Sequence, residues 1–154
     1  MELSSILQPE AVKVLSKSTS KKRLFQELGE IAAARHGLDA TDAITALQER
    51  ENLGPTGVGH GVALPHARIA GLEEVGGVFL RLDMPIDFNS VDRQPVDLVF
   101  ALFAPLDSGV DHLKALALVS RTMRDPDVCA KLRANSDSMA LHAILTEARS
   151  SQAA

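Results

Sequence analysis

The chain of 154 residues contains no tryptophan and no tyrosine, and it has one cysteine, Cys129. Since five phenylalanines are the only large aromatic side chains, we expect a core built mainly from aliphatic residues. A single cysteine excludes an internal disulfide and a zinc site made of several cysteines, and it fits a reducing compartment. Cys129 falls on the apolar face of an expected helix, which favours a buried and unreactive thiol.

Strong positive charge and long apolar runs are also missing. The formal net charge is −4, and the only basic run is the triplet 21–23, which we interpret as the solvated first turn of a helix. Nucleic acid is therefore excluded as the main partner, because phosphate neutralisation dominates such binding. No apolar run is long enough to span a membrane, and residues 1–5 lack the positively charged start of a signal peptide. We expect a cytoplasmic protein.

Apolar periodicity and capping residues predict one α/β domain over residues 1–154. Strands are expected at 11–15, 62–64, 75–82 and 96–104, and helices from a cap within 18–20 to His36, from Thr41 to a stop near Gly54, at 111–123, from Pro126, and from Ser136 or Ser138. The run 96–104 is apolar without interruption after Asp97, which is typical of a central strand buried on both faces. This order of elements predicts a layered domain with a mixed sheet.

The stretch 57–66 combines three glycines at alternate positions with a short apolar run and the sequence Leu-Pro-His. Glycine lets the backbone pass close to another group, or adopt dihedral angles that other residues avoid. Pro65 has a fixed φ and keeps Leu64 extended, so His66 leaves the apolar run in a restricted direction. A neutral imidazole presented in this way is a candidate nucleophile. This stretch alone leaves open the alternative that His66 lies in a loop or serves packing.

Three segments together resemble a known family. They are Gly57-Val-Gly-His-Gly-Val-Ala-Leu-Pro-His66-Ala-Arg68, residues 93–102 and residues 112–121. They resemble enzyme IIA proteins of the bacterial phosphotransferase system, mannitol/fructose type, and within that family the nitrogen-regulatory branch. The resemblance covers about residues 4–147, which we expect to form the ordered core. It implies a mixed β-sheet flanked by helices on both faces, a three-layer arrangement.

The resemblance also implies a site. Members of the family accept a phosphoryl group on one histidine from a small phosphocarrier protein, and His66 matches that histidine. His112 matches the second active-site histidine, and Arg50 matches the active-site arginine. The chemistry fits these residue types, because an arginine offers a planar fork of donors to phosphoryl oxygens. His112, expected near the start of its helix, can donate a hydrogen bond close to the positive end of the helix dipole.

Further residues have supporting roles in this hypothesis, each beside a simpler interpretation. Backbone N–H groups around Gly59 and the two neighbouring glycines could line an anion-binding nest. Arg68 would share a face with His66 in an extended chain and attract a phosphate or an acidic partner; a solvated charge is the equal alternative. His60 departs from the family, whose members tend to carry a carboxylate or Asn there. It either contacts the phosphoryl group or tunes the pKa of His66, or it points outward, which we favour slightly.

The leading hypothesis is a regulatory phosphocarrier, a phosphotransferase component rather than a free-standing metabolic enzyme, with no cofactor. Its implied targets are potassium-transport regulators, sensor kinases or stringent-response enzymes. The alternative is a sugar-specific enzyme IIA that passes the phosphoryl group to a membrane permease domain. A remote alternative is a zinc-type site formed by His60, His66 and His112 with an open position.

Overall fold

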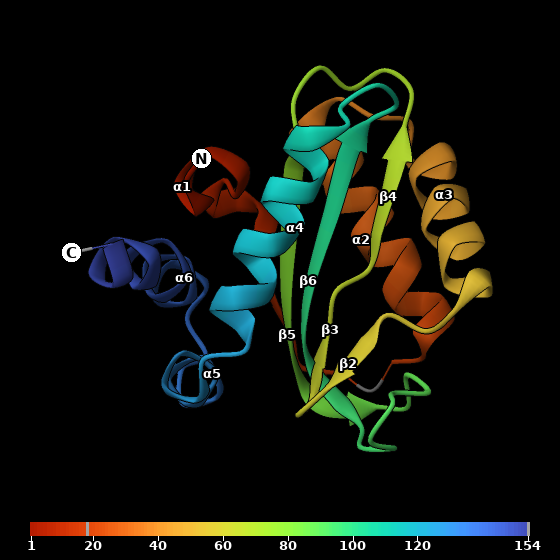
Figure 1. Cartoon of the computed structure of the whole chain (residues 1–154). Helices are drawn as coiled ribbons and strands as arrows, with labels where there is room; N and C mark the ends of the chain where they lie inside the picture. The colour runs from red at the N-terminus through yellow and green to blue at the C-terminus, as the bar shows by residue number, and fades with distance from the viewer. Residues whose placement is uncertain (18, 154) are drawn as a thin grey trace.

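A mixed β-sheet forms the centre of the computed structural model, which describes residues 1–17 and 19–153, with side chains up to residue 147 (Figure 1). Within this part of the chain the strands are β1 (Val12–Leu15), β2 (Gly57–Gly59), β3 (Val62–Ala63), β4 (His66–Ile69), β5 (Gly76–Ile86) and β6 (Val96–Pro105). Their order is β1-β5-β6-β3-β2, and β4 also pairs with β6. β1 runs parallel to β5, and β3 and β4 run parallel to β6, whereas β5–β6 and β2–β3 are antiparallel.

Helices cover both faces of this sheet. They are α1 (Leu3–Ile6), α2 (Lys21–His36), α3 (Ala40–Leu53), α4 (Val110–Met123), α5 (Pro126–Arg133) and α6 (Ser138–Ala153), with a 3₁₀ turn, η1, at Pro9–Ala11. α2 packs against α3 and β5 on one face, while α4 packs against β6 and α6 against β1 on the other (Figure 1). The predicted α/β domain of three layers is therefore confirmed.

The strand β6 is the centre of the core. Every residue from Leu98 to Pro105 is buried, as expected for a strand covered on both faces. Phe100 contacts Phe79 of β5 edge to face, with the two ring centroids 6.1 Å apart. Because β6 is fixed by neighbours on both sides, a strand that pairs with it is held firmly in register.

Pro65 divides the outer neighbour of β6 into two strands. β3 pairs with Leu98 and Val99, and β4 pairs with Leu102 to Pro105. Between them the proline has no N–H to donate, but its carbonyl accepts a hydrogen bond from the amide of Leu102 at 2.9 Å. The expected strand 62–64 therefore ends at Ala63, and the chain resumes as a strand at His66.

Helix boundaries agree with most of the expected caps. Ser20 caps α2 by accepting a hydrogen bond from the amide of Arg23, and Gly37 ends that helix with a φ of 71°; Ser18, also within the expected cap, lies outside the described residues. The expected cap at Thr41 is wrong. Asp39 caps α3 instead, because its carboxylate accepts from the amide of Asp42, an arrangement that is at least as favourable as a threonine cap.

Four elements differ from the expected pattern. β2 and β4 were not expected, since three or four residues are too few to show a period. β5 continues to Ile86, past a register irregularity after Arg81, and α1 forms before Pro9. The last helix begins at Ser138, which is one of the two starts expected for it. Among the described residues, no helix has the combination of length and apolar character that a membrane span requires.

Candidate functional site

His66 is the first residue of β4 and lies half-buried at the sheet edge. Its Nδ1 lies 2.9 Å from the backbone oxygen of Leu64. A carbonyl oxygen can only accept, so we assign the ring hydrogen to Nδ1, which leaves the lone pair of the neutral imidazole on Nε2. The pKa of His66 is lowered overall, mainly by burial. The hydrogen bond to the Leu64 carbonyl opposes this shift, the charge of Arg50 adds to it, and the charge of Glu51 opposes it. His66 is therefore neutral at pH 7 and has a free nucleophilic nitrogen.

His112 faces His66 from the opposite side of the site. It lies in the first turn of α4, its side chain is buried with 7% of the residue exposed, and the two ring centroids are 5.7 Å apart. Burial lowers the pKa of His112, as do the nearby charges of His66 and Arg68. Its Nδ1 has no hydrogen-bond partner among the described residues. A second neutral imidazole thus stands within reach of anything bound to His66.

Two arginines complete the site. Arg50, in the last turn of α3, donates from Nη1 to the carbonyl oxygen of Gly54 at 3.0 Å, which fixes one end of its guanidinium. Arg68 is exposed on β4, two residues after His66, and alternation along the strand places both side chains on one face. One pocket of about 580 Å³ is lined by Arg50, His66, Arg68 and His112, together with Ala46, Glu49, Leu53 and Ala67.

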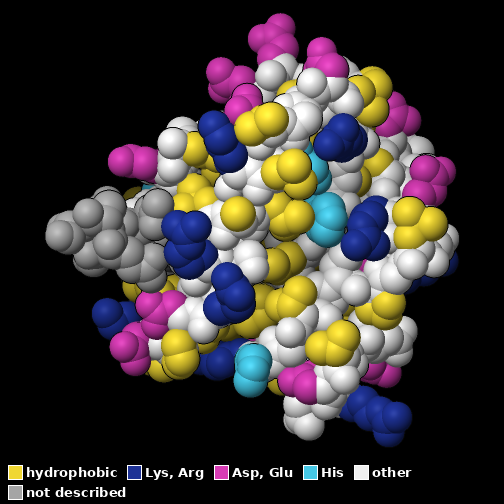
Figure 2. Space-filling model, in the orientation of Figure 1, with side chains coloured by type: hydrophobic (Ala, Val, Ile, Leu, Met, Phe, Trp, Pro, Cys, Tyr) yellow, Lys and Arg dark blue, Asp and Glu magenta, His cyan; other side chains and the backbone are white. Residues whose placement is uncertain are grey.

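The pocket favours an anion of small size. Two arginines against one carboxylate give it a positive charge when both histidines are neutral. On the face drawn in Figure 2, histidine and basic side chains lie among hydrophobic ones near the middle of the surface. Guanidinium groups and imidazole N–H groups are the donors that suit phosphoryl oxygens.

The structure places His60 and Gly59 on the β2–β3 hairpin rather than among the residues that line this pocket. His60 is exposed and has a φ of 57°, and its amide donates to Asp92 Oδ2 at 2.9 Å. A Cβ on Gly59 would meet the same carboxylate at 3.4 Å, and one on Gly61 would lie 2.5 Å from Arg133 Nη2. These glycines admit neighbouring side chains close to the backbone. A phosphoryl-binding role for the hairpin stays a prediction.

The three-histidine alternative finds no support in this arrangement. Within the described residues, no group of three or more His, Cys, Asp and Glu side chains could hold a metal ion. His66 and His112 lie together, whereas His60 is on the hairpin. The predicted buried thiol is present: Cys129 is buried, and its Sγ lies 3.1 Å from the carbonyl oxygen of Met123.

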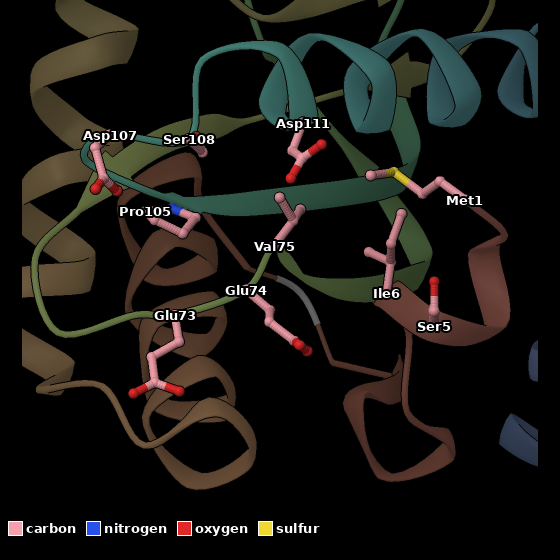
Figure 3. A pocket seen from close by; sticks show the side chains of 10 residues that line it. All are labelled: Met1, Ser5, Ile6, Glu73, Glu74, Val75, Pro105, Asp107, Ser108 and Asp111. Carbon is pink, nitrogen blue, oxygen red and sulfur yellow. The ribbon is translucent and has the colours of Figure 1, made fainter.

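A second pocket, of about 540 Å³, differs in its charge (Figure 3). Four acidic residues line it: Glu73, Glu74, Asp107 and Asp111. They share the pocket with Ser5, Ser108 and four apolar residues. Its carboxylates would repel a phosphoryl group, whereas the two arginines of the pocket at His66 would attract one.

Several residues at the basic pocket were not predicted from the sequence. Ala46, Glu49, Arg50 and Leu53 share one face of α3 because they are spaced three or four residues apart. Arg50 alone was a candidate, although the same spacing could have identified its three companions. Glu51 was also missed, and its contacts are described below.

Comparison with known proteins identifies the family. Residues 5–148 match the family model described as phosphoenolpyruvate-dependent sugar phosphotransferase system, EIIA 2. A nitrogen regulatory protein of Bradyrhizobium diazoefficiens is 48% identical over 145 residues, which cover 94% of this chain and 95% of that protein. The crystal structure of the nitrogen regulatory protein IIA-Ntr from Neisseria meningitidis is 35% identical, covers 94% of this chain and 99% of that one, and superposes with a TM-score of 0.85.

A more distant structure shares the fold. It is the Escherichia coli complex of enzyme IIA mannitol with phosphorylated enzyme IIB mannitol. The matching chain is 17% identical and superposes with a TM-score of 0.73, and the match covers 92% of this chain and 99% of that chain. The chain described here belongs to the EIIA 2 family and is similar to its nitrogen regulatory proteins.

Proposed function

We propose that this member of the EIIA 2 family is a phosphocarrier that accepts a phosphoryl group on Nε2 of His66. The observation that carries the proposal is the hydrogen bond between His66 Nδ1 and the Leu64 carbonyl. This bond leaves Nε2 as the nucleophile, in a pocket that also contains two arginines and His112. The donor that suits this chemistry is a phosphohistidine on a small phosphocarrier protein.

The transfer step needs no cofactor and no net proton movement. The lone pair of His66 Nε2 attacks phosphorus, and the bond between phosphorus and the donor imidazole breaks with its electron pair remaining on the donor nitrogen. The ring of His66 gains positive charge while Nδ1 keeps its hydrogen. The Leu64 carbonyl oxygen then accepts a charge-assisted hydrogen bond, which is stronger than the bond to a neutral ring. Transfer in the reverse direction follows the same path, as a carrier requires.

The surrounding side chains stabilise the transferred group. Phosphoryl transfer spreads negative charge over three equatorial oxygens, so catalysis rests mainly on positioning and electrostatics. Arg50 and Arg68 supply positive charge, and His112 as the Nε2–H tautomer supplies a neutral donor. The lowered pKa of both histidines suits these roles, since a protonated His66 has no lone pair to attack with.

Regulation would act through the surface around the site. Leu53 is 85% exposed on α3, and Leu113 is 62% exposed beside His112 on α4. A phosphoryl group adds about two negative charges to this partly apolar rim. The phosphorylated and the unphosphorylated protein would therefore attract different partners. We propose a cytoplasmic regulatory protein, with potassium-transport regulators, sensor kinases or stringent-response enzymes as the candidate targets.

Intact mass spectrometry tests the carrier function. The protein is incubated with phosphoenolpyruvate, the first enzyme of the phosphotransferase system and the small phosphocarrier. One acid-labile, alkali-stable phosphoryl group is expected on the wild type and on His142→Ala, a matched histidine substitution on α6, and none on His66→Ala. An unmodified wild type beside a phosphorylated control enzyme IIA in the same tube would contradict the proposal.

A further inference from the structure

The loop between α3 and β2 connects a partly buried ion pair, Lys21–Glu51, to the ring of His66. We propose that Glu51 and Thr56 are positioning residues for this histidine, because they hold the Leu64 carbonyl that fixes its tautomer. This inference rests on the proposed function of His66. It concerns residues that do not line the basic pocket.

The first step is the carboxylate of Glu51, whose side chain is 7% exposed. It accepts three hydrogen bonds: from Lys21 Nζ at 2.8 Å, from the amide of Thr56 at 2.8 Å and from the hydroxyl of Thr56 at 2.6 Å. Lys21 also donates to the carbonyl oxygen of Phe88 at 3.2 Å, and its ammonium lies 4.5 Å from the Phe88 ring centroid. A buried carboxylate with these partners is well compensated and holds Thr56 in one orientation.

The second step passes from Thr56 to Leu64. Thr56 is buried with 5% exposed, and its carbonyl oxygen accepts a hydrogen bond from the amide of Leu64 at 2.9 Å. The amide and the hydroxyl of Thr56 therefore both donate to Glu51, while its carbonyl oxygen accepts from Leu64. Since the next residue is Pro65, which restricts the backbone of Leu64 to extended conformations, the direction of the Leu64 carbonyl is also fixed.

The third step is the ring itself. The Leu64 carbonyl accepts from His66 Nδ1 at 2.9 Å, while the backbone of His66 is held by its pairing with β6. What the backbone pairing does not fix is the rotation and the tautomer of the imidazole. A Leu64 carbonyl that turned away would allow Nε2 to carry the hydrogen, and the nucleophilic lone pair would then point away from the phosphoryl donor.

The same loop also positions the arginine. Gly54, whose carbonyl accepts from Arg50, lies two residues before Thr56. Both the nucleophile and one cation of the site therefore depend on a short segment that Glu51 anchors. A neutral glutamine at this position could accept with one oxygen only, and its amide would face Thr56 or Lys21 as a competing donor.

The experiment compares Glu51→Gln and Thr56→Val with Thr56→Ser, which keeps the hydroxyl, and with the controls Glu30→Gln and Thr45→Val on exposed helix positions. Long-range ¹H–¹⁵N spectra of ¹⁵N-histidine-labelled protein report the tautomer of His66 without any phosphoryl transfer. We expect the Nδ1–H form in the wild type, Thr56→Ser and the controls, and a raised Nε2–H population in Glu51→Gln and Thr56→Val. Single-turnover phosphorylation should slow about tenfold in those two variants.

Two results would overturn the inference. One is an Nε2–H tautomer of His66 in the wild-type protein. The other is an unchanged tautomer and transfer rate in both Glu51→Gln and Thr56→Val, with only a lower unfolding midpoint, which would show a purely structural network. A wild type that accepts no phosphoryl group would count against the proposed function instead, while the tautomer comparison would still decide the positioning claim.

Discussion

Replacement of Arg50 by glutamine removes a cation from the site while keeping a side chain that can hydrogen-bond. In the structure, Nη1 of Arg50 donates to the Gly54 carbonyl, so its other N–H groups remain for a phosphoryl group in the same pocket. Loss of one preorganised donor to developing charge typically slows a reaction by about a hundredfold to a thousandfold. Because Arg68 remains, we expect the lower end, a rate loss of about a hundredfold, or about 2.7 kcal/mol of activation free energy.

The stability of the fold should change much less. The lost hydrogen bond to Gly54 is worth about 1 kcal/mol, so the urea unfolding midpoint should shift only slightly. The assay is single-turnover transfer from the phosphorylated phosphocarrier, quenched in alkali and read by intact mass, with Arg35→Gln on the exposed face of α2 as the matched control. A wild-type rate for Arg50→Gln would refute the electrostatic role of Arg50, and an equal loss in Arg35→Gln would point to general charge steering.

Three further outcomes follow from the same geometry. His66 and His112 have lowered pKa values in the folded protein, so the unfolded chain binds more protons in the pH window just below the ordinary histidine pKa. The urea unfolding midpoint should therefore fall as pH decreases through that window. The fall should be smaller in the double variant His66→Gln/His112→Gln. Gly61→Ala should lower the free energy of unfolding in urea more than Gly71→Ala. Both glycines have a positive φ, but a Cβ at Gly71 would meet open space, whereas a Cβ at Gly61 would crowd the Arg133 guanidinium. We expect a loss of about 1–2 kcal/mol for Gly71→Ala and a larger loss for Gly61→Ala. Leu53→Ser should raise KM for the phosphocarrier without changing the unfolding midpoint, because that side chain is 85% exposed.

Long periodic segments made most of the fold predictable. α2 and β6 each present a pattern that no other element could produce: helical spacing between a serine cap and a terminal glycine, and an apolar run between two prolines. Shorter elements were not predictable in the same way. β2 and β4 contain three and four residues, and only their pairing with β3 and β6 makes them strands.

The site shows a similar division. His66, His112 and Arg50 were identified through a family resemblance, and the structure brings all three to one pocket with Arg68. Glu51 could not be found from the sequence, because Lys21 comes from α2 and meets Glu51 only after α2 and α3 pack, while Thr56 lies in the irregular loop after α3, where no periodic pattern places its side chain. His60 shows that a place within the motif does not fix a side chain's direction: an outward position was slightly favoured from the sequence, and in the structure the residue is exposed, its amide donating to Asp92 and its carbonyl accepting from Arg133.

The central claim is that His66 carries the phosphoryl group on Nε2, with Nδ1 bonded to the Leu64 carbonyl. The most direct measurement is a long-range ¹H–¹⁵N spectrum of the ¹⁵N-histidine-labelled protein after phosphorylation by the phosphocarrier. We expect one histidine to change, His66, with phosphorus coupled to Nε2 and the hydrogen retained on Nδ1. Phosphorus on Nδ1 of His66, or on any other histidine, would contradict the account.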